Sequence, residues 1–460
     1  MIESFGRRAW VLFIVAACSG EADDTAATAT TGDGSTSAAS STMSSGDPST
    51  AGTETASGGE TAGTSAGTST AGTSTAGTTT AGTTTAGTTT TTTSGTTATT
   101  DSTSTTASTT DGTTGDPPGP GGTIPVGGGD YFLLGANYPW KSYGGDFGGN
   151  NWGVYGVHTK EGEIGGDLGN LGQNHLRVVR WFVFTDGRAG VNFDDNGAPT
   201  GLGEHVLEDM DAAIAQATAA GVYLVPVLVD FHWMFWPQTN NGVQTGGRSD
   251  VITDPQKRAA FVDKVVVPLV EHSAQSPAIL AWEIMNEPEW SIADLPSPSP
   301  DGQANAVPLA DFYAFAAAIS AAVHDHSNHY VTLGSACLKW HRVWTPGFAQ
   351  AHGWPSLDLD FYQTHYYPWM DNQSVQNDPD LGTTQFSPTV QAYGDLGLDR
   401  PMVVGELIIS DKAAERLDNL LERGYAGAWP WSLTSDFSLD LGGLSGWGAA
   451  HSDLVDLPSP

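Results

Sequence analysis

Residues 279–290 read ILAWEIMNEPEW and give the clearest indication of the fold. The run 279–285 is apolar apart from Glu283, which is typical of a strand that is buried on both faces of a parallel sheet. Pro288 cannot donate a hydrogen bond to a neighbouring strand, so we expect the strand to end at Glu287. The alternation of side chains along a strand places Glu283 and Glu287 on the same face. The segment therefore predicts a buried parallel strand with a carboxyl group at its C-terminal end.

Seven further short apolar segments predict the other strands. They span residues 132–136, 175–180, 222–229, 330–333, 359–364, 402–405 and 424–429. Longer segments between the strands predict helices over residues 204–219, 254–273, 308–326 and 412–423. This alternation indicates an α/β fold, a (β/α)8 TIM barrel over residues 131–460. The length also fits two small domains, although no second low-complexity break divides it, and the Gly-rich stretch 441–460 offers no convincing eighth helix.

Glu406 follows the seventh predicted strand, in the segment 401–407 that reads PMVVGEL. Glu287 ends the fourth strand, and the C-terminal ends of strands four and seven face each other across the opening of such a barrel, where its chemistry is located. A single Glu at a strand end is more often a solvated loop residue. Two carboxyl groups at this opening, however, are the minimum apparatus for glycoside hydrolysis.

The residues around both glutamates resemble those of glycoside hydrolase family five, which comprises retaining cellulases and β-mannanases built on this barrel. The segment 282–288, WEIMNEP, closely matches the family's Asn-Glu-Pro signature. The resemblance covers about residues 131–435 and implies that Glu287 is the general acid/base and Glu406 the nucleophile. Leu407 departs from the pattern, because an aromatic residue is commoner after the nucleophile.

The same resemblance implies a set of supporting side chains. His365 and Tyr367, in FYQTHYYPW, match the family's His-x-Tyr pair, and His232, in VDFHW, matches its strand-three histidine. Arg180 stands where the family has an active-site arginine. Arg177 is a rival for that role, but the two side chains lie on opposite faces of the strand and Arg180 is nearer its C-terminal end.

Two more side chains are expected at the bound sugar. Asn286 precedes the acid and can donate a hydrogen bond to the 2-hydroxyl of the sugar. Trp431, in AWPWSL, aligns with the tryptophan that floors the family's central sugar subsite, and Trp429 is its competitor. Seven more tryptophans near predicted strand ends are candidates for stacking on sugar rings or for plain packing. They are Trp140, Trp152, Trp233, Trp236, Trp290, Trp340 and Trp369.

The chemistry requires one protonated and one ionised carboxyl group. Burial and a neighbouring carboxylate should raise the pKa of the acid, whereas Arg180 and Tyr367 should keep the nucleophile ionised. The expected reaction retains the anomeric configuration through a covalent glycosyl-enzyme, with the carboxyl groups about 5–5.5 Å apart. It needs no cofactor and no metal.

The expected substrate is a β-1,4-linked polysaccharide: mannan, glucomannan or a β-glucan such as cellulose. The segment 180–184, RWFVF, is reminiscent of β-mannanases, which favours mannan slightly. The pattern does not distinguish endo from exo action. The alternative function is a non-catalytic, glycan-binding surface lipoprotein on the same barrel, although such a protein has no need of the complete catalytic set.

The first 130 residues predict a targeting signal followed by a tether. Residues 1–17 have a basic pair before a short apolar run, as in a secretory signal. The segment 15–18, VAAC, resembles a bacterial lipobox, which implies that Cys18 is lipidated and anchors the protein in the cell envelope. The outer membrane is favoured because Ser19 follows, and a plain secretory signal is the alternative. Residues 18–130 form a Thr/Ser/Gly/Ala-rich linker that lacks aromatic and basic residues over 19–118, so a disordered tether is expected.

Charge excludes one class of partner. The net charge is −34, and residues 131–460 hold 39 acidic against 15 basic residues. Binding to a phosphate backbone requires clustered Lys and Arg, which the sequence lacks, so we expect no nucleic-acid partner. We also expect a monomer. Inside the barrel, Glu283 is expected to be an ion-pair partner. His324 and His326 flank Asp325 in a pattern that resembles a metal site, but a solvated helix end is the favoured interpretation.

Overall fold

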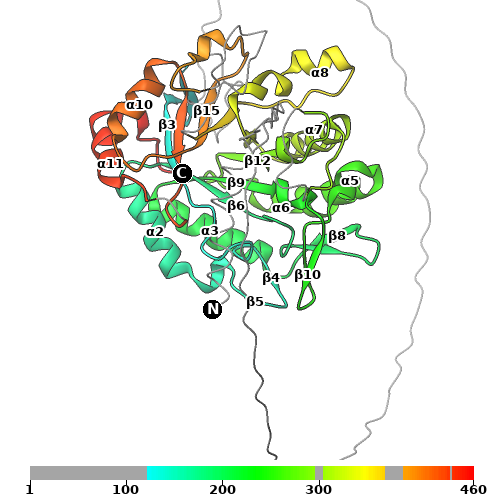
Figure 1. Ribbon diagram of the computed structural model, residues 1–460. Coiled ribbons are helices and arrows are strands. Elements are labelled where there is room, and N and C mark those ends of the chain that lie inside the picture. The colour runs from blue at the N-terminus through cyan, green and yellow to red at the C-terminus, as the bar shows by residue number, and fades with distance from the viewer. Residues whose placement is uncertain (1–121, 296–303, 368–386, 436–437) are drawn as a thin grey trace, which may run out of the picture. The chain divides into compact units, whose positions relative to one another are not determined.

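The computed structural model describes residues 122–295, 304–367, 387–435 and 438–460 (Figure 1). The expected signal segment 1–17, Cys18, the predicted tether up to residue 121 and Trp369 lie outside the described residues. Within the described ranges, no helix has both the length and the apolar character that crossing a membrane requires.

Eight parallel strands close into a barrel in chain order, as the sequence predicts. They are β3 (Leu133–Asn137), β6 (Val178–Phe182), β9 (Tyr223–Asp230), β12 (Ala281–Asn286), β13 (Tyr330–Ser335), β14 (Tyr362–Tyr366), β15 (Met402–Leu407) and β16 (Gly427–Pro430). Pairing of β16 with β3, with Gly427 opposite Leu133, closes the ring. The strand residues are buried throughout, which explains why the strands are nearly continuous apolar runs in the sequence. The TIM barrel is thereby confirmed.

Helices cover the outside of the barrel (Figure 1). The predicted ones correspond to α3 (Val206–Ala220), α7 (Leu309–His326), α10 (Ala413–Glu422) and a continuous helical run made of α5 (Pro255–Phe261), η3 (Val262–Val266) and α6 (Val267–Ser273). Asp254 caps this run by accepting hydrogen bonds from the backbone N–H groups of Gln256 and Lys257. The structure adds α2 (Glu161–Gln173), α4 (Ser249–Thr253) and α8 (Pro346–His352).

The expectation that the C-terminal stretch lacks a helix is wrong. Residues 441–450 form α11 (Leu441–Ala450), and α12 (Ser452–Val455) follows. Asp440 caps α11 through the backbone N–H of Gly443, and Trp447 is buried against Phe132 with ring centroids 5.6 Å apart. Glycine lowers the intrinsic helix propensity of this segment, but the cap and the packing of Trp447 compensate for it.

The described residues that precede β3 pack against the barrel. A hairpin of β1 (Ile124–Val126) and β2 (Gly129–Tyr131) precedes the barrel. Ile124 and Val126 are buried in one apolar cluster with strand residues such as Leu133 and Val225. The hydroxyl of Tyr330 donates to the carbonyl oxygen of Pro125 at 2.9 Å, which fixes the hairpin to the start of β13.

Candidate active site

Arg180, in β6, organises the C-terminal end of the barrel. Its side chain is fully buried, and it donates to both oxygens of Glu283 at 2.6 Å. It also donates to Glu406 Oε1 and to Asn286 Oδ1, both at 2.6 Å, and to Asn137 Oδ1 at 3.0 Å. One guanidinium thus joins side chains from three other strands. The expectation that Glu283 is an ion-pair partner is confirmed, and its partner is Arg180.

The rival arginine lies elsewhere. Arg177 donates to Asp456 Oδ1 at 3.0 Å and to the carbonyl oxygen of Gly221 at 3.3 Å. Because side chains alternate along a strand, Arg177 and Arg180 point to opposite sides, as expected. Arg180 is therefore the arginine of the site.

Glu406, at the end of β15, is held by two donors. Its Oε1 accepts from Arg180, and its Oε2 accepts from the hydroxyl of Tyr367 at 2.6 Å. Burial raises the pKa of Glu406 above its ordinary value, although the charge of Arg180 and the hydrogen bond from Tyr367 act against this rise. These donors favour the ionised carboxylate, which suits a nucleophile.

Glu287 lies directly after β12, in a left-handed backbone conformation with φ 45°. A non-glycine residue at positive φ is strained, and such strain is concentrated at functional sites. One carboxyl oxygen of Glu287 lies 2.8 Å from His365 Nδ1, and the other accepts from Trp290 Nε1 at 3.0 Å. Burial raises the pKa of Glu287 to about 8, so the group is protonated at neutral pH, as a general acid must be. The nearby charge of Asp230 also raises this pKa, as expected of a neighbouring carboxylate.

His365 lies between the two glutamates. Burial lowers the pKa of His365 to about 4, so its imidazole is neutral. Its Nε2 lies 3.4 Å from Gln363 Oε1, and donation there leaves Nδ1 to accept the proton of Glu287. Nδ1 also lies 3.6 Å from Glu406 Oε1. His365 therefore contacts both carboxyl groups.

A second chain of contacts runs through Asn286. Its amide donates to Asp230 Oδ2 at 2.7 Å, while its carbonyl oxygen accepts from Arg180. The other oxygen of Asp230 accepts from the backbone N–H of His232 at 2.9 Å and contacts its imidazole. Burial alone would lower the pKa of His232, but the charge of Asp230 raises it above the ordinary value. The side chain of His232 is 17% exposed, so it borders the site beside Phe231 and Phe235.

The two candidate tryptophans occupy different layers. Trp431 packs edge-on against Phe182 and Trp140, with ring centroids 6.3 and 5.9 Å apart. Trp429 instead donates from Nε1 to the carbonyl oxygen of Leu133 and belongs to the cluster that contains the N-terminal hairpin. Trp431 is therefore the tryptophan on the side of the catalytic residues.

Three residues of this network were not expected as site residues: Asn137, Gln363 and Asp230. Trp290, expected either to stack on a sugar ring or to pack, donates a hydrogen bond to Glu287. Asn137 donates to the carbonyl oxygens of Gly405 and Trp429, and Gln363 donates to Glu283. The sequence offers one signal for two of them: Asn137 and Asp230 are polar residues at the C-terminal ends of strands β3 and β9. The remaining tryptophans divide: Trp233, Trp290 and Trp340 are buried, whereas Trp236 is 55% exposed.

Two groups of histidine and carboxylate side chains are relevant to metal binding. His324 and His326 contact separate carboxylates, Asp360 at 3.0 Å and Glu271 at 2.8 Å, so they do not converge. Glu287, His365 and Glu406 each offer a ligand atom, and these atoms lie within 4.8 Å of one another. A metal ion bound there would compete with Arg180 and Tyr367 for the same oxygens.

The chain is similar to known glycoside hydrolases over the region that holds this site. The model of the family described as cellulase (glycosyl hydrolase family 5) matches residues 146–435. Mannan endo-1,4-beta-mannosidase of Mytilus edulis is 27% identical over 331 residues, which cover 66% of this chain and 84% of the relative. The enzyme of the same name from Cryptopygus antarcticus is 25% identical and covers 68% of this chain and 84% of its own length.

Solved structures share the fold. The beta-mannanase of Mytilus edulis superposes with a TM-score of 0.60 at 23% identity, covering 73% of this chain and 97% of that one. The beta-1,4-mannanase of Aplysia kurodai gives a TM-score of 0.60 at 24% identity, covering 74% and 98%. At these identities the likeness shows that the chain shares the fold of these enzymes.

Proposed function

The chain belongs to the cellulase family of glycosyl hydrolases, family 5, and from this premise we propose that it is an endo-β-1,4-mannanase that retains the anomeric configuration. The observation that carries the proposal is the pair of carboxyl groups at the ends of β12 and β15. An oxygen of Glu287 lies within 4.8 Å of an oxygen of Glu406. Retaining glycosidases hold these groups about 5–5.5 Å apart, and inverting ones about 6.5–9.5 Å.

In the first step, Glu406 attacks the anomeric carbon while Glu287 gives its proton to the glycosidic oxygen. The glycosidic bond breaks, the leaving sugar departs with that proton, and a glycosyl ester forms on Glu406. The environments of the two groups suit these roles: burial holds the proton on Glu287, whereas Arg180 and Tyr367 donate to Glu406. In the second step, Glu287 takes a proton from water as the water oxygen displaces Glu406, which restores both groups.

The choice of mannan rests on the relatives, both of which are mannan endo-1,4-beta-mannosidases. The run Arg180–Phe184, which is reminiscent of β-mannanases, agrees with this choice, and Phe182 of this run packs on Trp431. Purified protein should be assayed on mannan, glucomannan, carboxymethyl cellulose and xylan. We expect reducing ends to be released fastest from mannan, and hydrolysis confined to carboxymethyl cellulose would contradict the substrate but not the family.

The mechanism has a separate test. The first product followed by NMR should carry the β configuration, and Glu406→Ala should abolish hydrolysis. Glu415→Ala, in exposed α10, is the matched control and should remain active, because its side chain is 73% exposed. An inverted first product, or hydrolysis that survives in Glu406→Ala, would overturn the double displacement. If the wild type released no sugar from any of these polysaccharides, the glycan-binding alternative would be favoured.

A further inference from the structure

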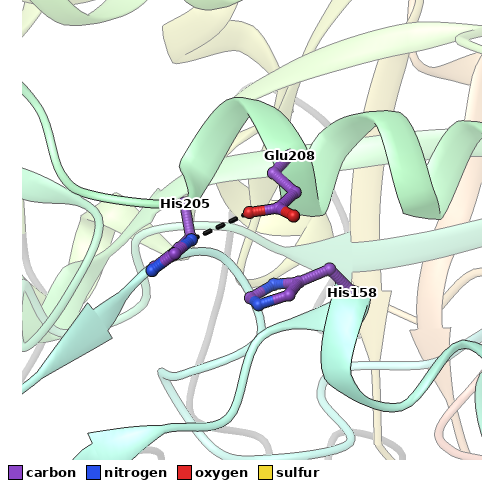
Figure 2. Close-up of side chains that lie close together, drawn as sticks. All are labelled: His158, His205 and Glu208. Atoms are coloured by element: carbon purple, nitrogen blue, oxygen red, sulfur yellow. Dashed lines mark hydrogen bonds and ion pairs between the residues drawn. The ribbon is translucent and has the colours of Figure 1, made fainter.

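Three side chains form a second cluster whose hydrogen bonds do not involve the catalytic residues (Figure 2). His158 comes from η1 (Val157–Thr159), in the loop between β3 and α2, while His205 and Glu208 come from the start of α3. The two imidazole rings are stacked, with centroids 4.9 Å apart, and His205 Nδ1 lies 2.8 Å from Glu208 Oε2. Each residue offers one ligand atom, and these atoms lie within 4.8 Å of one another.

A buried carboxylate orients one of the two histidines. Asp209 is fully buried and accepts from His158 Nδ1 at 2.5 Å and from the backbone N–H groups of His158 and Gly148. Because Nδ1 is held by Asp209, the lone pair of His158 Nε2 remains for a ligand. A carboxylate that binds the second nitrogen of an imidazole is the usual support of a metal-binding histidine.

The other histidine has an unusual backbone position. His205 precedes the first residue of α3 in a left-handed conformation with φ 68°, and its side chain makes no capping hydrogen bond to the helix. Asp, Asn, Ser and Thr are the residues that normally cap a helix here. A residue that breaks the local rule without a local gain is a candidate for a functional role.

The charges around the cluster favour a cation. Three carboxylates, those of Glu204, Glu208 and Asp209, lie within four residues of His205 at the start of α3. The start of a helix carries a partial positive charge that opposes cation binding, but these three carboxylates lie at the same place and offset it.

We propose that His158, His205 and Glu208 bind a divalent transition-metal ion such as Zn²⁺, with water as the fourth ligand. Two imidazoles and one carboxylate suit such ions, whereas Ca²⁺ and Mg²⁺ prefer oxygen ligands. Tetrahedral Zn²⁺ places its ligand atoms roughly 3.3 Å apart. The side chains of His205 and Glu208 are 33% and 59% exposed, so they can rotate toward the ion, which replaces the proton that they now share.

Such an ion would link the loop between β3 and α2 to the start of α3 at the rim of the barrel. The loop between β3 and α2 contains Trp140, which packs on Trp431 beside the catalytic residues, as well as His158. Joining it to the start of α3 would stabilise that rim. The proposal is independent of the substrate, because no ligand atom belongs to the catalytic network.

The test uses untagged full-length protein that has been treated with a chelator and then titrated with ZnCl2 by calorimetry. We expect one Zn²⁺ per chain and a rise in Tm on binding, both lost in His158→Ala and His205→Ala. Asp209→Asn should keep the site but weaken the affinity about 10- to 100-fold. Circular dichroism of each variant in chelator shows whether it is folded.

The matched control is His272→Ala. His272 contacts Asp211 of helix α3 at 2.7 Å and is 32% exposed, but among the described residues it belongs to no group of three potential metal ligands. It should bind Zn²⁺ as the wild type does. The proposal is overturned if the wild type binds no Zn²⁺, or if folded His205→Ala binds it unchanged. Loss of binding in Glu406→Gln instead would place the ion at the catalytic residues and would equally overturn it.

Discussion

Two side chains adjust the pKa of Glu287 in opposite directions. The charge of Asp230 raises this pKa, whereas the hydrogen bond from Trp290 lowers it. A general acid works only while protonated, so kcat/KM should fall as the pH rises through about 8. Asp230→Asn should move this alkaline limb to lower pH, and Trp290→Phe should move it to higher pH, as measured by pH-rate profiles of hydrolysis.

The opposite signs make these two variants controls for each other. A loss of packing or of substrate binding would reduce the rate in both variants, but it would not separate the alkaline limbs of their two pH-rate profiles. Limbs that stay together, or that move in the reverse order, would show that Glu287 is not the group that titrates.

Tyr367 should support the other glutamate. Its hydroxyl donates to Glu406 Oε2 at 2.6 Å and acts to lower the pKa of that carboxyl group. In Tyr367→Phe the pKa of Glu406 should rise, so the acidic limb of the pH-rate profile should move to higher pH. The value of kcat/KM should fall roughly 10- to 150-fold, the usual effect of a hydrogen bond to a charged group.

The control for this prediction lies on β14, the strand that Tyr367 directly follows. Tyr362 donates to Asp399 at 2.7 Å, away from the catalytic residues, so Tyr362→Phe should leave both limbs in place. A Tyr367→Phe profile that matches the wild type would remove Tyr367 from the mechanism.

At the scale of single residues, the sequence predicts those site residues whose neighbours along the chain form a recognisable pattern. Glu287 is recognised because Asn and Pro flank it after an apolar strand, and Arg180 because strand parity separates it from Arg177. Asp230 and Asn137 are different, because their roles depend on partners 56 and 268 residues away. No local pattern records such pairings, which arise only when the strands close into a ring.

At the scale of elements, all eight strands were found but α2 and α11 were missed. A buried strand of a parallel sheet must be apolar along its whole length, which leaves a strong signal. A helix on the outside needs only one apolar face, and glycines in α2 and α11 weaken that signal further. Helix α2 still buries Ile164, Leu168 and Leu171 at helical spacing.

The glycines of α2 differ in their surroundings, which gives a test of this explanation. A Cβ atom at Gly166 would meet nothing within 4 Å, so Gly166→Ala should raise the free energy of unfolding by about 0.5–1 kcal/mol. At Gly172 a Cβ atom would collide with the backbone carbonyl oxygen of Ala220. Gly172→Ala should therefore lower the free energy of unfolding by about 1–3 kcal/mol.

Denaturant unfolding of both variants beside the wild type measures these differences. If both substitutions stabilised the protein, the contact between α2 and the end of α3 would be looser than the structure has it. If both substitutions destabilised the protein, the low helix propensity of glycine would not be what weakens α2.

At the scale of the whole molecule, composition separates the catalytic domain from the rest of the chain. Every residue of the site lies between Asn137 and Trp431, whereas residues 19–118 hold no aromatic or basic side chain. We propose that this segment is a spacer. As a flexible chain of about 110 residues, the whole linker 18–130 would span roughly 60 Å, enough to hold a barrel away from a surface to which its first residue is attached.

The attachment itself is proposed to be a lipid on Cys18, the last residue of the VAAC motif. If so, full-length protein produced in a bacterium that processes lipoproteins should fractionate with the membranes, and Cys18→Ala should move it to the soluble or secreted fraction. Cys337→Ala is the matched control, because Cys337 is the only other cysteine of the chain and is buried in the barrel. Mass spectrometry of the mature N-terminus should find acylated Cys18. An unmodified N-terminus at any other residue, with wild type and Cys18→Ala in the same fraction, would instead identify residues 1–17 as part of a plain secretory signal.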